Sequence, residues 1–352
     1  MPRPLSLALI AVVTVVVASL AGPAPAAHAH GTAGQSPRNW RSRVIAIEPA
    51  VAGLSVRTTD LGEHVEVTSD EREVIVIGYD GEQFLRVGPD GVWRNERSPA
   101  VFFNRSRAAR EAPPAEFDAA AAPEWERIGD GPSFRWHDHR AHPMGRDRSF
   151  VWTIELRAGA TTISVRGDVE PLTSPALALV LIPLSGSGAA VVIAARRRPA
   201  SAVASALALL AAAAIALSIA RWTASTESSA AKLAVVSWPL LAAALGTVAA
   251  VRVAQRGLPR AAPLALFGAG SLTIASGLAL VPWLANAHLP ASGPAALWRT
   301  IVAIILGAGA LCTAAAARAL RQHEGGPRQG RPHQRDTSQP EASASAAMRR
   351  AM

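Results

Sequence analysis

Five apolar stretches fill the second half of the chain, and they constrain its fold more than any other feature. They cover about residues 176–195, 201–220, 233–251, 262–282 and 298–317. Each is close to the length of helix that crosses about 30 Å of hydrocarbon, where the backbone polar groups must be satisfied internally. The sequence therefore predicts an all-α membrane bundle of five transmembrane helices, whose odd number places the two chain ends on opposite sides of the bilayer.

Positive charge is concentrated in this membrane half. The formal net charge is +9, but residues 31–173 have a balance of −4, whereas residues 174–352 have a balance of +12. Thirteen basic residues fall in the predicted inner connections and the tail, against three in the outer connections, namely Arg221, Lys232 and Arg299. This is the positive-inside rule. The expected partner is therefore the lipid bilayer, and no nucleic-acid partner is expected.

The residues of the apolar stretches add expectations about packing. No charged residue falls at mid-membrane, which argues against a transporter or a proton pump. Small residues such as Gly268, Gly270 and Gly277 suit close helix packing. Four tryptophans are expected to form an interfacial belt at the outer ends of the helices: Trp222, Trp238, Trp283 and Trp298.

The N-terminus carries the pattern of an export signal. Arg3 precedes an apolar run over residues 5–20, and a stretch of small residues follows. Cleavage after Ala29 would make His30 the new N-terminus. An uncleaved anchor is the alternative, because the run approaches the length that spans a thin bilayer. Other cleavage sites follow Ala26 and Ala27, and the second of these would free His28.

These patterns divide the chain into four parts and predict a multi-pass protein of the cell membrane. A signal peptide occupies residues 1–29, and an extracytoplasmic domain occupies residues 30–173. The transmembrane region covers residues 174–320. The remainder, residues 321–352, is rich in Arg, Gln, Pro, Ser and Ala, which is typical of a disordered tail and here places that tail in the cytoplasm.

The exported part has the pattern of an all-β domain. Asp80-Gly81 is a tight-hairpin signal, Gly88-Pro89-Asp90-Gly91 is a second turn, and residues 108–124 have the composition of a long loop. Short alternating runs predict seven strands, which favours an immunoglobulin-like sandwich held together without a disulfide. The predicted strands are Val44–Ile47, Leu54–Thr58, His64–Thr68, Val74–Tyr79, Gln83–Val87, Phe150–Leu156 and Thr161–Gly167.

A histidine-rich segment within this domain is the candidate site. It contains His137, His139, His142 and Met144 within eight residues. In an extended chain His137 and His139 point to one face, and Pro143 turns the chain so that His142 and Met144 return toward it. Imidazole and thioether groups form a soft ligand set that suits copper. The segment therefore predicts copper as the cofactor, with these four residues as ligands.

Two further histidines can add to the predicted ligand set. A freed N-terminal His30, or His28, would supply an amine and an imidazole, and His64 lies on a predicted strand. The alternative is a structural turn, in which Trp136 anchors the core, Asp138 pairs with Arg140, and the histidines are hydrogen-bonded. No spacing in the segment has the specificity of a paired C-x-x-C site, so both interpretations remain open.

The exported domain carries the pattern of a binding module, not of an enzyme. It contains no nucleophile motif, oxyanion motif or Gly-rich phosphate loop. Copper binding is the first functional expectation. The rival is a metal-independent scaffold that recognises another component of the cell envelope through the sandwich surface.

Short motifs across residues 40–170 carry a family resemblance. They are Gly78-Tyr79-Asp80-Gly81-Glu82, Phe84-Leu85-Arg86-Val87, Pro89-Asp90-Gly91-Val92-Trp93, Arg97-Ser98-Pro99-Ala100 and Trp136-His137-Asp138-His139-Arg140. With them the chain resembles a group of uncharacterised exported, membrane-anchored proteins of high-GC Gram-positive bacteria. The group implies export and anchoring but no activity, and its motif usually ends in His-Trp-Met, where this chain has His142-Pro143-Met144. The histidine at the mature end and the sandwich pattern are also similar to exported copper-binding proteins of the copper-resistance type.

Overall fold

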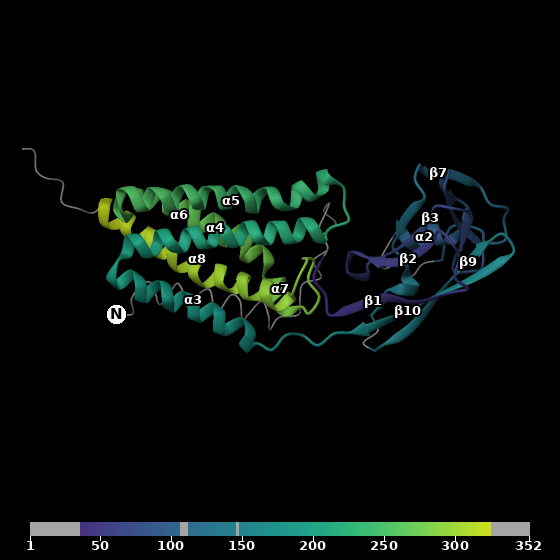
Figure 1. Cartoon of the computed structure of the whole chain (residues 1–352), viewed down its shortest axis with the longest axis horizontal. Helices are drawn as coiled ribbons and strands as arrows, with labels where there is room; N and C mark the ends of the chain where they lie inside the picture. The colour runs from purple at the N-terminus through teal and green to yellow at the C-terminus, as the bar shows by residue number, and fades with distance from the viewer. Residues whose placement is uncertain (1–35, 106–111, 146–147, 325–352) are drawn as a thin grey trace, which may run out of the picture.

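The computed structural model describes residues 36–105, 112–145 and 148–324 of the chain. A β-region and a helical bundle lie end to end (Figure 1). The predicted signal peptide, which includes His28, lies outside the described residues, and so do His30 and the tail beyond residue 324. The described part therefore contains the N-terminal β-sheet region and the apolar helices that follow it.

The larger sheet of the β-region has seven antiparallel strands in the order β1-β10-β9-β4-β5-β6-β7. Buried and more exposed residues alternate along β9 (Phe150–Ala158) and β10 (Thr161–Pro171), because one face of the sheet covers the core. The first strand, β1 (Trp40–Glu48), pairs with the last, β10. The others are β4 (Val74–Ile77), β5 (Gln83–Gly88), β6 (Gly91–Asn95) and β7 (Trp125–Gly129).

A smaller antiparallel sheet shares the core with the larger one. Its strands are β2 (Leu54–Thr59), β3 (His64–Ser69) and β8 (Ser133–Trp136), in the order β2-β3-β8. Val67 on β3 and Leu85 on β5 are both fully buried in one hydrophobic cluster. The rings of Phe84 and Trp136 meet edge to face across it, with centroids 6.1 Å apart. Burial of this shared apolar surface holds the two sheets together.

The seven predicted strands are confirmed, since each overlaps an observed strand. The Asp80-Gly81 hairpin is also confirmed, because β4 and β5 are antiparallel and Gly81 adopts a φ of +85°, a conformation that favours glycine. The prediction lacks β6, β7 and β8, which are only four or five residues long. It also lacks a short helix, α2 (Pro99–Arg105), between β6 and the predicted loop.

Five helices are long and apolar enough to cross a membrane, which confirms the five predicted spans. A short 3-10 turn, η3 (Leu278–Leu280), and α7 (Pro282–Ala285) continue the fourth span beyond its main helix. The long helices are α3 (Ala178–Arg197), α4 (Pro199–Ala224), α5 (Ser229–Arg256), α6 (Leu258–Ser276) and α8 (Ala295–Glu324).

The connections between these helices fall into two groups. The α4–α5 connection and the α7–α8 connection both contact the β-region, through Thr226 and His288 respectively. The α3–α4 connection at Arg198 and the α5–α6 connection at Gly257 therefore lie at the far end of the bundle. Most of the arginines of the helices belong to this far end, as the predicted charge asymmetry requires.

Two expectations about packing in the bundle hold only in part. A Cβ on Gly268 would lie 3.0 Å from the Cβ of Ala249, and one on Gly277 would lie 2.9 Å from Leu306, so both glycines permit close helix contact. The prediction is wrong for Gly270, which faces open space. It is also wrong for Trp283, which is only 3% exposed because its ring packs inside the bundle instead of in an interfacial belt.

Candidate functional site

The histidine-rich segment lies at the end of the β-region that contacts the helices. It leaves β8 at Trp136 and turns through η2 (His139–Ala141). Beside it, η1 (Asp60–Gly62) leads into β3, and the Asp60 carboxylate accepts a 2.5 Å hydrogen bond from Thr226 of the α4–α5 connection. The site is therefore built where the two parts of the chain meet.

The segment turns at η2, whereas alternation of His137 and His139 would require an extended chain. The Asp138 carboxylate caps η2 by accepting a hydrogen bond of 2.9 Å from the backbone N–H of Arg140. The predicted histidines are nevertheless brought together. The ring centroid of His137 lies 5.1 Å from that of His139 and 5.1 Å from that of His142. A tight turn, and not strand alternation, creates this cluster.

Asp138 organises the turn. It is 1% exposed and accepts hydrogen bonds from Trp136 Nε1 at 2.9 Å and from Arg140 Nη2 at 2.8 Å. Burial would raise the pKa of Asp138, but the charge and hydrogen bonds of Arg140 outweigh it, and the pKa is lowered. Arg140 also donates to the carbonyls of Ile77 and Gly78. The predicted core anchor at Trp136 and the predicted local ion pair are both confirmed.

Glu63, which no sequence motif indicates, lies at the centre of the cluster. It is 5% exposed, and its Oε2 lies 2.5 Å from Arg38 Nη1 and 3.8 Å from His142 Nε2. Its Oε1 lies 3.5 Å from His137 Nδ1. Glu63 and His137 are 74 residues apart in the sequence, and only strand pairing brings them together. The one sequence signal is that Glu63 directly precedes the predicted strand at His64.

His137 is held as a neutral imidazole that presents one lone pair. Its Nδ1 lies 3.0 Å from the carbonyl oxygen of Glu63, so we assign the proton to Nδ1, which donates. Its Nε2 is buried and has no hydrogen-bond partner. Burial lowers the pKa of His137, while the hydrogen bond to Glu63 opposes this effect. Metal-binding histidines typically have this arrangement, with one nitrogen donating to a carbonyl and the other available.

His142 and Met144 join the cluster in different ways. The imidazole of His142 packs against the ring of Trp40, with centroids 4.7 Å apart. Its Nδ1 accepts a 3.4 Å hydrogen bond from the backbone N–H of Met144, which has a left-handed φ of 47° in the turn. The described contact of Met144 with the cluster is therefore through its backbone. A role for its thioether stays a prediction.

The spacing of the rings suits a metal ion, but their orientation does not complete a site. Two imidazoles that bind one ion at about 2 Å place their ring centres about 5 Å apart, and His137 has this spacing to both neighbours. Within the described ranges, no group of three or more His, Cys, Asp and Glu residues is placed to hold an ion. His64 lies 6.4 Å from the His137 ring and bonds to Asp60 at 2.9 Å.

Charged groups tie the cluster to the helices. Asp60 receives hydrogen bonds from His64 and Thr226 and lies 3.0 Å from Arg135 Nη1. Arg135 also pairs with Glu227 of the α4–α5 connection at 3.1 Å. Burial would raise the pKa of Asp60, but these partners outweigh it and hold the pKa far below its usual range.

The cluster thus combines imidazole nitrogens with the backbone carbonyl and the carboxylate of Glu63. His30, the remaining predicted ligand, lies outside the described residues. Comparison of the chain with protein-family models, with curated proteins and with solved structures finds no significant match.

Proposed function

We propose that this chain is a multi-pass membrane protein of the cell envelope whose β-region binds copper outside the cytoplasm. The observation that carries the proposal is His137 Nε2, a buried nitrogen without a hydrogen-bond partner beside two further imidazoles. An unpaired buried polar atom is costly, and a metal ion would satisfy it.

The ligand set that we propose consists of His137, His139 and His142. Met144 is a fourth candidate, because it lies in the same turn and its soft thioether favours copper over zinc. The N-terminal amine and ring of His30 would add to the set after cleavage behind Ala29. A bound copper ion would serve either as an electron-transfer centre or as cargo that the protein delivers. Glu63 fixes the proton position of His137, and so leaves Nε2 to bind.

Sidedness and architecture belong to the same proposal. The far-end arginines favour a cytoplasmic location for the α3–α4 and α5–α6 connections and the tail, which leaves the β-region outside. We further propose that the two sheets form an immunoglobulin-like sandwich. Their antiparallel strands and shared hydrophobic core support it.

Metal titration of the purified full-length chain in detergent tests the proposal. We expect one copper ion to bind with a dissociation constant at or below about 1 μM, in preference to zinc. The double variant His137→Ala with His139→Ala should weaken binding at least about tenfold, because it removes two imidazole ligands. His323→Ala, which changes an exposed histidine at the end of α8, is the matched control. Unchanged affinity in the double variant would remove the assignment.

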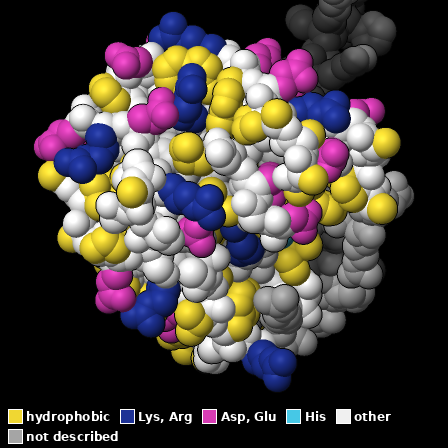
Figure 2. All heavy atoms as spheres, turned by 90° about the vertical axis from the view of Figure 1, so that its right-hand side faces the viewer, with side chains coloured by type: hydrophobic (Ala, Val, Ile, Leu, Met, Phe, Trp, Pro, Cys, Tyr) yellow, Lys and Arg dark blue, Asp and Glu magenta, His cyan; other side chains and the backbone are white. Residues whose placement is uncertain are grey.

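A second candidate function is a metal-independent scaffold, and one surface feature favours it. Arg86 lies over the ring of Trp93 at 4.4 Å and over the ring of Trp125 at 5.2 Å, and Arg127 lies 5.6 Å from the Trp93 ring. Such Trp and Arg side chains are enriched in binding surfaces. Elsewhere, basic and acidic side chains mix across the end of the β-region (Figure 2). The two candidate functions are separated by using the chain to capture envelope proteins from membranes, with and without chelator. A metal-independent scaffold should retain its partners when chelator is present.

A further inference from the structure

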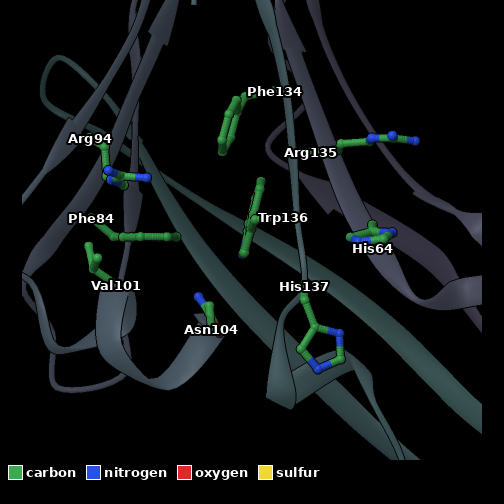
Figure 3. Close-up of a pocket in the computed structure, with 9 residues that line it drawn as sticks. All are labelled: His64, Phe84, Arg94, Val101, Asn104, Phe134, Arg135, Trp136 and His137. Carbon is green, nitrogen blue, oxygen red and sulfur yellow. The ribbon is translucent and has the colours of Figure 1, made fainter. Parts of the chain in front are cut away.

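A cavity of about 290 Å³ opens beside β8, next to the histidine cluster. Phe134 and Trp136 project from the strand toward Phe84 on the larger sheet, while Arg135 lies on the other side of β8 (Figure 3). Val101 of α2 contributes to the apolar wall. The cavity thus offers three aromatic rings within a space that fits one small molecule.

The cavity has polar side chains but, among the described residues that line it, no carboxylate. Two of these residues are arginines and two are histidines. Asn104 of α2 also lines it. The amide oxygen of Asn104 accepts a 2.5 Å hydrogen bond from the Tyr79 hydroxyl, but its Nδ2 is buried and has no partner. The Asn104 nitrogen faces the side of Phe84 and Trp136 (Figure 3). A ligand with an acceptor oxygen would satisfy it.

Arg94 places a positive charge on the core-facing side of the larger sheet. It lies directly opposite Leu85, which is fully buried, and residues opposite each other in antiparallel strands share a face. Its Nε donates to Glu96 at 2.6 Å, and its Nη2 lies 3.6 Å from Glu126. These two contacts hold the guanidinium of Arg94 in place through Nε and Nη2, and neither of them involves Nη1. Although these carboxylates offset much of its charge, an arginine that lines the cavity can still donate from Nη1 to an acceptor oxygen of a ligand.

We propose that this cavity binds a small aromatic carboxylate. Its ring would pack against Phe84, Phe134 and Trp136, where aromatic contacts add to the burial of apolar area. Its carboxylate accepts hydrogen bonds from Asn104 and Arg94. His137 lines the cavity as well as belonging to the imidazole cluster, but the carboxylate contacts that we propose are with Asn104 and Arg94, so ligand binding here does not require copper.

The test uses the full-length chain in detergent, with chelator present so that copper plays no part. Benzoate is the probe, and binding is followed by tryptophan fluorescence and calorimetry. We expect saturable binding of benzoate, with weaker binding of benzamide, which lacks the charge, and of cyclohexanecarboxylate, which lacks the aromatic ring. No saturable binding of benzoate would overturn the proposal.

Three variants and one control variant locate the binding. Asn104→Asp keeps an oxygen that accepts from Tyr79 but replaces the Nδ2 donor with a second oxygen. This variant should weaken benzoate binding at least about tenfold. Arg94→Gln should weaken it similarly, while Arg57→Gln, at an exposed arginine of β2, should leave it unchanged. If the Asn104 variant does not fold, Val101→Phe provides the second test by filling the cavity. Benzoate binding that is equal to wild type in Arg94→Gln or in Val101→Phe would also overturn the proposal.

Discussion

Asp60 is a buried carboxylate whose partners come from both parts of the molecule. Its side chain is 3% exposed, and its pKa is lowered by His64, Thr226 and Arg135 against the opposing effect of burial. A carboxylate with a lowered folded-state pKa contributes stability above its unfolded pKa, here 3.8, and loses that stability as the pH falls below this value. The folded chain should therefore lose stability between about pH 5 and pH 2, as Asp60 takes up a proton on unfolding.

Asp60→Asn isolates this contribution, because asparagine also tolerates the left-handed φ of 55° at this position. We expect the variant to lose about 2 kcal/mol of stability at pH 7 and to show a flatter acid limb. Thermal unfolding of the full chain in detergent, followed by tryptophan fluorescence from pH 7 to pH 3, measures both. Parallel acid limbs in the two proteins would contradict the role of Asp60.

At the residue scale, sequence reasoning finds groups that are neighbours along the chain and misses groups that only the fold brings together. His137, His139 and His142 are recognisable because they share one short segment. The geometry of these histidines is not recognisable from the sequence, because the hydrogen bond by which Asp138 caps η2 turns the segment. The side chains therefore do not alternate as they would in a strand. Glu63 is missed because its contact with His137 depends on the pairing of β3 with β8.

Elements with strong periodicity are predictable, and short ones are not. The five spans are recognisable because hydrocarbon requires a long apolar helix. β8 has only four residues and pairs in the described structure only with β3. Four residues are too few for an alternating apolar pattern to be recognised in the sequence. The residues of β8 nevertheless line the cavity and lead into the histidine cluster. Part of each candidate site therefore lies on an element that the sequence does not reveal, although β3 and β5, which also line the cavity, are predicted.

A contact between two helices yields the prediction at this scale. A Cβ on Gly307 of α8 would lie 2.0 Å from the carbonyl oxygen of Leu184 in α3. Gly307→Ala must therefore push these helices apart, at a cost of about 1–3 kcal/mol. Thermal unfolding in detergent should show a lower midpoint for this variant. Gly270→Ala is the matched control, because that position faces open space and alanine favours helix, so its midpoint should not fall.

At the scale of the whole molecule, the β-region is anchored to the bundle through more than the linker into α3. The backbone of Arg38 exchanges two hydrogen bonds with that of His288 in the α7–α8 connection, at 3.0 and 2.9 Å. Arg135 reaches Glu227 in the α4–α5 connection. Both connections are therefore on the same side of the membrane as the β-region. The β-region, the α4–α5 connection and the α7–α8 connection thus lie on one side, so locating any one of them locates all three.

Charge predicts which side this is. The end of α3 and the α3–α4 connection carry Arg196, Arg197 and Arg198. The α4–α5 connection that touches the β-region has Glu227, with Arg221 and Lys232 at the flanking helix ends. Because arginine-rich connections stay in the cytoplasm, protease added to intact cells should remove the β-region and spare an epitope tag at the C-terminus. Cells with opened membranes, in which the tag is also lost, provide the control. Digestion of the tag in intact cells, with the β-region protected, would reverse the orientation and place the histidine cluster in the cytoplasm.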